Sequence, residues 1–244
     1  MKRDATMEAA VAQASATALP ATIKMWTYLS KHHIQAAARF ARLSASLERA
    51  HKGKSSPNLF VEHRAYVLGS VLTAVAFLEA TINELFAKAA DGRLDGLSPE
   101  ATAGLAERWV KPRTARLPIC RKYQIALTSA RRQPFKPGTA PYHDVDLLMQ
   151  LRNALVHYKP EWVIAASGAD QKRDTIKKWQ KRLQGKFAVN PLTAKGNPFY
   201  PDKCLSHGCA KWAVESSLKF TDDFFSRMGL KPPYTDVRAD LATE

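Results

Sequence analysis

Three side chains that could act on a phosphodiester lie within six residues of one another, in the stretch RNALVH that contains Arg152, Asn153 and His157. Histidine exchanges protons near neutral pH, so it can serve as a general acid or base. Arginine carries a permanent charge on a planar fork that matches two phosphate oxygens. A helix would place Asn153 and His157 on one face, with Arg152 about 140° around the axis from His157. Together these residue types suit cleavage of a phosphodiester.

The surrounding sequence predicts that these residues end a helix. The apolar run LLMQL precedes them and Pro160 disfavours a helical residue before it, so we expect a helix from about Tyr142 to Tyr158. At the C-terminal end of a helix, the dipole favours a charged imidazole. The spacing of Arg152 and His157 alone is uninformative, because a chain rich in arginine contains such pairs by chance. The helical context is what gives the spacing meaning.

The stretch RNALVH resembles the R-N-x-x-x-H signature of HEPN domains. The upstream stretch FLEATINELF is similar to the polar-marked helix that packs beside that motif in bacterial members. The resemblance extends, in patches, from about Leu59 to Phe225. It implies an α-helical domain that dimerises, so that two copies of the motif face each other across a cleft. Many such domains are metal-independent endoribonucleases, and bacterial members are often toxins or phage-defence effectors.

The resemblance also implies a role for each residue of the motif. His157 would transfer a proton during attack of the ribose 2′-hydroxyl, Arg152 would hold the phosphate, and Asn153 would orient the site. Tyr158 and Lys159 would contact the RNA. Some toxin members carry a tyrosine two residues after the histidine, a position that Lys159 occupies here.

Three other interpretations of the motif stay open. Some family members have lost catalysis and serve as modules that bind RNA or a partner protein, and a basic helical DNA-binding protein is a third class. In the plainest interpretation, Arg152 pairs with an acid such as Asp146 or Glu161, and His157 is an ordinary residue at a helix end. The nuclease interpretation implies RNA, a second copy of the chain and a cognate antitoxin or other regulatory protein as partners.

Glu79 and Asn83 stand four residues apart in an otherwise apolar stretch. Because burial without partners would be costly, both side chains should be hydrogen-bonded. They could bridge neighbouring helices, or they could support Arg152 or His157 from behind.

The charge balance favours a polyanionic partner. The chain has 37 Lys and Arg residues against 22 Asp and Glu residues, a formal net charge of +15, which would attract nucleic acid. The segment QKRDTIKKWQKRLQGK fits either a surface that follows a nucleic-acid backbone or a solvated helix face. The most basic block runs from Arg108 to Lys136 and contains no acidic residue. The residues of this block that we expect to bind RNA are Arg108, Lys111, Arg113, Arg116, Arg121, Lys122, Arg131 and Arg132.

The cysteines indicate neither a disulfide framework nor a metal site. Three cysteines are too few and odd in number, which favours the cytoplasm. Cys204, His207 and Cys209 would splay around a helix, and a fourth ligand is missing, so we expect no metal and no cofactor. Glycine-rich phosphate loops and hydrolase motifs are also absent from the sequence.

The elements that must position the motif are helices throughout, because apolar residues recur at three and four rather than alternating. We therefore expect an all-α fold, a HEPN-like antiparallel bundle with extra helices and long loops. It comprises a flexible segment 1–20, one domain over 21–230 and a mobile tail 231–244. The run from Ala65 to Leu78 is too short to span a bilayer and should belong to the central helix, without a membrane partner. The expected helices are 23–50, 59–89, 98–109, 142–158, 170–184 and 203–228.

Overall fold

The computed structural model describes residues 27–51, 56–110, 114–160 and 174–244. These residues form helices and connecting loops without any strand, so the all-α prediction is confirmed. The expected segment 1–20 and the first turns of the expected helix 23–50 lie outside the described residues. The elements are α1 (Ser30–Ala50), α2 (Pro57–Ala90), α3 (Pro99–Val110), η1 (Thr114–Arg116), α4 (Ile119–Ser129), α5 (Tyr142–Val156), α6 (Asp174–Leu183), the π-helical η2 (Phe199–Lys203), α7 (His207–Met228) and η3 (Thr235–Leu241).

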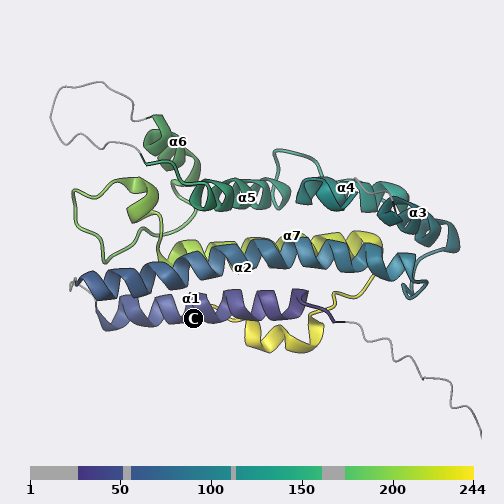
Figure 1. Cartoon of the computed structure of the whole chain (residues 1–244), viewed down its shortest axis with the longest axis horizontal. Coiled ribbons are helices and arrows are strands. Elements are labelled where there is room, and N and C mark those ends of the chain that lie inside the picture. The colour runs from purple at the N-terminus through teal and green to yellow at the C-terminus, as the bar shows by residue number, and fades with distance from the viewer. Residues whose placement is uncertain (1–26, 52–55, 111–113, 161–173) are drawn as a thin grey trace, which may run out of the picture.

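The helices are arranged in layers around α2 and α7 (Figure 1). α1 and η3 lie on one side of this pair, while α3, α4 and α5 follow one another on the other side. α2 and α7 run parallel, since Ser70 of α2 bonds to Ala210 near the start of α7. α1 and α5 run in the opposite direction, so the end of α5 lies near the start of α2.

α2 is the core helix, as its apolar pattern predicted. The expected stripe Val67, Val71, Val75, Leu78, Ile82 and Leu85 is buried along its whole length. By length and composition, α2 is the one helix in the described part of the chain that could cross a membrane. It instead packs against α1, α3, α4, α5 and α7, as the central helix of a helical protein does.

α1 packs on α2 through small side chains. Its buried face consists of Ser30, Ile34, Ala37, Ala38, Ala41, Ser44 and Ala45. Leu29, just before the helix, is 52% exposed. Small residues let the two backbones approach closely, and a Cβ added at Gly69 of α2 would lie 2.9 Å from the ring of Phe40. Gly69 therefore makes room for the ring of Phe40.

An aromatic cluster joins the layer of α4 and α5 to α7. Tyr123 of α4 is fully buried, and its ring meets Phe220 and Phe224 edge-on at centroid distances of 4.8 and 4.7 Å. Its hydroxyl donates to the carbonyl oxygen of Leu78 at 2.8 Å. Phe135, in the loop before α5, stacks on Phe220 at 4.6 Å. The cluster thus fixes both α4 and the entry into α5.

Lys122 is a structural residue of the core, contrary to the expected contact with RNA. The side chain is fully buried, and its Nζ donates to Glu79 Oε1 and Asn83 Oδ1, each at 3.0 Å. The expectation was wrong because adjacent residues of a helix point to different sides: Lys122 lies on the inner side of α4, while its neighbour Arg121 is exposed. The polar pair on α2 therefore bridges two helices.

Replacing Lys122 with methionine should lower the free energy of unfolding by about 1–3 kcal/mol, because Glu79 and Asn83 lose their shared donor. Urea denaturation followed by circular dichroism measures this change. The matched control Arg121→Met, on the exposed side of the same helix, should stay within about 0.5 kcal/mol of the parent protein. Equal denaturation midpoints for Lys122→Met and the parent would refute the structural role.

The expected mobile tail packs onto the bundle instead. Tyr234 is fully buried, and its ring meets Phe77 edge-on at a centroid distance of 5.3 Å. Its hydroxyl donates to Asp222 at 2.8 Å and lies 2.6 Å from the Thr221 hydroxyl. η3 then follows α1, where Lys31 pairs with Asp236 at 2.7 Å. The buried tyrosine fixes a segment whose many charges suggested a solvated tail.

Candidate functional site

α5 is held in the bundle by Val145, Leu147, Leu148 and Leu151, which are all buried. The three leucines are each at most 1% exposed, so they serve the core of the bundle. Val156, in the last turn, is 52% exposed. The exposed apolar side chain of α5 therefore lies at its C-terminal turn.

Arg152, Asn153 and His157 lie together at this C-terminal turn. α5 ends at Val156, and the backbone N–H of His157 donates to the carbonyl oxygen of Asn153 at 2.9 Å. Asn153 and His157 are exposed, and Arg152 is half-buried. No side-chain hydrogen bond or ion pair engages any of the three within the described residues. Asn153 and His157 therefore present their side chains to solvent, while Arg152 is partly covered.

Asp146, one of the two acids that could have neutralised Arg152, has another partner. The carboxylate of Asp146 accepts from Gln150 Nε2 at 2.7 Å instead. Glu161 lies outside the described residues. Glu79 and Asn83, the expected supports of the motif, are bonded to Lys122 on α4. The motif is therefore not supported by that polar pair.

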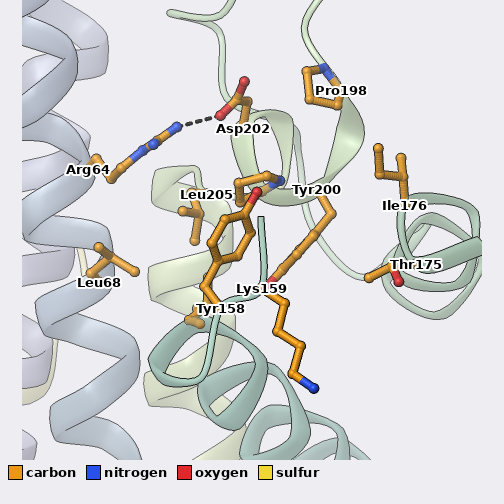
Figure 2. A pocket seen from close by; sticks show the side chains of 12 residues that line it. Arg64, Leu68, Tyr158, Lys159, Thr175, Ile176, Pro198, Tyr200, Asp202 and Leu205 are labelled. Carbon is orange, nitrogen blue, oxygen red and sulfur yellow. Dashed lines mark hydrogen bonds and ion pairs between the residues drawn. The ribbon is translucent and has the colours of Figure 1, made fainter. Parts of the chain in front are cut away.

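A cleft of about 440 Å³ opens beside the motif (Figure 2). Its walls come from α2, the end of α5, the start of α6 and the segment around η2. Tyr158 and Lys159, which follow the motif directly, line this cleft, whereas Arg152, Asn153 and His157 do not. The structure thus separates the motif residues, which lie outside the cleft, from Tyr158 and Lys159, which line it.

The cleft has an aromatic side and a charged side. The Tyr200 hydroxyl donates to the carbonyl oxygen of Ala154 at 3.0 Å, and its ring stacks on Trp179 of α6 at 5.6 Å. On the opposite side, Arg64 of α2 pairs with Asp202 of η2 (Figure 2). These contacts attach η2 to both α5 and α2, so they hold the walls of the cleft together.

α6 carries exposed cations and also contributes to the wall of the cleft. Trp179 and Leu183 are buried, whereas Lys177, Lys178 and Lys181 are exposed. Ile176, in the first turn, lines the cleft. The same helix therefore presents a positive face to solvent and an apolar wall to the cleft.

The basic block lies mostly at the other end of the layer. Arg108 ends α3, Arg116 lies in η1 and Arg121 is on α4, and all three are exposed. Arg131 and Arg132 follow α4 and are exposed as well. α3 is remote from α6 and from the C-terminal end of α5 (Figure 1). Lys111 and Arg113 lie outside the described residues.

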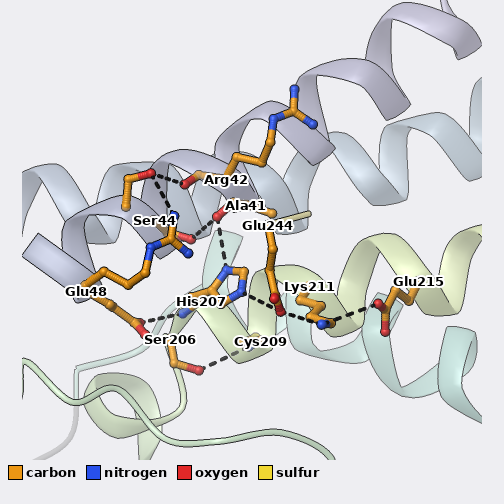
Figure 3. Close-up of polar contacts among 12 residues, drawn as sticks. Ala41, Arg42, Ser44, Glu48, Ser206, His207, Cys209, Lys211, Glu215 and Glu244 are labelled. Atoms are coloured by element: carbon orange, nitrogen blue, oxygen red, sulfur yellow. Dashed lines mark hydrogen bonds and ion pairs between the residues drawn. The ribbon is translucent and has the colours of Figure 1, made fainter. Parts of the chain in front are cut away.

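The two cysteines and the histidine expected not to form a metal site contribute to the packing around the start of α7. Burial raises the pKa of the Cys204 thiol to about 12 and that of Cys209 well above its ordinary value. His207 Nδ1 lies 3.1 Å from the carbonyl oxygen of Ala41, and its backbone N–H donates to Glu48 at 2.6 Å (Figure 3). No three His, Cys, Asp or Glu residues of the described ranges are grouped as a metal site. This region ties the start of α7 to α1.

Sequence reasoning missed the far wall of the cleft. Arg64 and Leu68 belong to a helix that we considered only as core, and Tyr200, Asp202 and Leu205 belong to a segment expected to be a loop or the start of the last helix. The signal that could have found them is the dense aromatic and proline content of NPFYPD, which is unusual for a solvated connection.

A comparison with protein-family models, curated proteins and solved structures finds no match to this chain. The all-α fold and the cleft therefore rest on the structure described above. The likeness to HEPN domains rests on the motif and its surroundings in the sequence.

Proposed function

We propose that this protein is a HEPN-like, metal-independent endoribonuclease, of the kind that acts as a toxin or phage-defence effector. The observation that carries the proposal is the joint presentation of Arg152, Asn153 and His157 on the exposed final turn of α5, with no side-chain partner among the described residues. The high positive charge supplies attraction for the RNA.

Cleavage by the neighbouring ribose needs two proton transfers. A base removes the proton of the 2′-hydroxyl, whose oxygen attacks phosphorus, and an acid protonates the 5′-oxygen that leaves; a 2′,3′-cyclic phosphate and a 5′-hydroxyl result. His157 can perform one of these transfers, and Arg152 can neutralise the phosphate oxygens. A single protomer offers one histidine at this turn.

A second copy of the chain would complete the site. In an isologous dimer the two motif turns approach across the twofold axis, so that each supplies a histidine and an arginine. The exposed Val156 lies between the motif residues and gives such an interface an apolar centre. The dimer is part of the proposal, as are a cognate inhibitor protein and a cytoplasmic location.

A silent HEPN module that binds RNA or a protein is the second candidate. The observation that favours it is that no side chain of the described residues orients the imidazole of His157. A general base is usually held in place by a third group. Cleavage by the intact protein, or its absence, separates the two candidates.

The first prediction concerns His157. His157→Ala should reduce RNA cleavage by at least about 100-fold in buffer that contains EDTA, because the proton transfer is removed. Gel analysis of total RNA and end-group mapping of the fragments provide the measurement. Arg152→Lys should also lose most activity, since an ammonium group cannot reproduce the guanidinium fork.

His143→Ala is the matched control, because His143 is an exposed histidine in the first turn of the same helix. It should cleave like the parent protein. Parental cleavage by His157→Ala would show that the catalytic assignment is wrong.

The exposed residues of the basic block should contribute to RNA attraction. Changing Arg108, Arg121 and Arg131 to glutamate should weaken binding and flatten the plot of log affinity against log salt, by about 0.7 for each phosphate that the protein no longer neutralises. Fluorescence anisotropy with a single-stranded RNA measures the slope. A control that reverses the exposed Lys195, Lys219 and Lys231 carries the same change in net charge. Equal slopes in both variants would assign the block to solubility alone.

The dimer should depend on the motif turn. Val156→Asp should convert a dimer into a monomer at micromolar concentration, because two carboxylates would meet near the axis. Light scattering coupled to size-exclusion chromatography measures the mass. Val110→Asp, at a valine of α3 that is 75% exposed, is the control and should leave the dimer intact. A parent protein that is monomeric would remove the composite site.

A further inference from the structure

We infer that the cleft beside the motif, between α2, the end of α5, α6 and η2, binds one unstacked base of the single-stranded RNA substrate. The inference rests on the proposed function and assigns a separate task to residues outside the R-N-x-x-x-H motif. The volume of about 440 Å³ lies within the range of about 300–1,000 Å³ that is common for small-ligand sites.

Tyr158 supplies the stacking surface. Its side chain points into the cleft (Figure 2), and the residue is 47% exposed, so one part of the ring is open to a ligand. The ring centroid lies 6.2 Å from that of the buried Tyr200, at an interplanar angle of 40°. Single-strand-binding proteins use such aromatic platforms, because every base has a flat apolar face. Leu68 and Leu155 add apolar wall on either side.

The ion pair of Arg64 and Asp202 supplies the polar side of the cleft. Asp202 also accepts from Asn197 at 2.9 Å, and the Arg64 guanidinium lies 4.3 Å from the ring centroid of Phe60. The two side chains are therefore held in place before a ligand arrives. A carboxylate beside a guanidinium offers acceptors and donors side by side, and each RNA base has an edge with both.

The position of the cleft favours RNA over an unrelated small molecule. Tyr158 follows His157 directly in the chain, so the cleft that Tyr158 lines adjoins the turn that carries the motif. Lys177, Lys178 and Lys181 are exposed on α6, the helix whose first turn lines the cleft. Cations next to an aromatic platform provide both attraction for the backbone and a place for the base.

The test measures binding without cleavage. The full chain with His157→Ala is titrated in EDTA with a fluorescent oligoribonucleotide of mixed sequence, by fluorescence anisotropy. Adding Tyr158→Ala should weaken binding by about 10-fold, whereas Tyr158→Phe should stay within about twofold, because stacking does not need the hydroxyl. Tyr66→Ala, on another face of α2, is the control and should bind like the His157→Ala protein. Equal affinities for Tyr158→Ala and Tyr66→Ala would overturn the inference.

Abasic substitution identifies the bound base. The base is removed from one position of the oligoribonucleotide at a time. At one position, this removal should weaken binding about as much as Tyr158→Ala does, and Tyr158→Ala should then cause no further loss of affinity. Strictly additive effects at every position would show that Tyr158 contacts no base and would overturn the inference. If the parent protein cleaves no RNA but this coupling is found, the base-binding site is supported and the nuclease proposal is refuted. If the parent protein cleaves RNA but Tyr158→Ala does not change binding, the nuclease proposal is supported and the base-binding site is refuted.

Discussion

The rest of the structure depends on one constraint: the apolar surface of α2 must be buried against other helices. Its apolar residues surround so much of the helix that one neighbour could not remove them from water. α1 packs on one side of α2 through alanines and serines. α7 lies alongside, and α3, α4 and α5 pack on the remaining side. On the side that faces α4, the polar side chains of Glu79 and Asn83 accept hydrogen bonds from the buried Lys122. These bonds fix the position of α4 on α2.

The cleft follows from this arrangement. α4 and α5 cover the side of α2 in succession, and α5 ends near Leu68, so the first turns of α2 need a different cover. η2 provides it through the ion pair of Arg64 and Asp202, and α6 stacks on η2 through Trp179. Three short elements meeting a long helix leave a hollow where continuous helices would fill it. The end of α5, with its motif, lies at the rim of this hollow.

The sequence predicted the helices whose patterns are strong and failed where packing decides. The apolar run from Ala65 to Leu78 indicated the central helix, and the apolar stripe of this run is buried in α2. The small residues on the buried face of α1 carry little hydrophobic signal in the sequence. The burial of Lys122 and Tyr234 also escaped prediction, since each depends on partners far away in the chain. For the site, the sequence placed the motif at a helix end but gave no sign that α2 and η2 enclose a cleft next to it.

The contacts that hold α5 have a consequence for the time at which its final packing can form during synthesis on the ribosome. α5 is synthesised after α2 but before η2 and α7, and both of these hold it, through Tyr200 and through the cluster of Phe220. A nascent chain that ends shortly after the motif therefore has only part of the packing for α5. The final geometry of the motif and of its cleft requires the last long helix to emerge and dock, so the assembled site belongs to the finished chain rather than to its growing precursor.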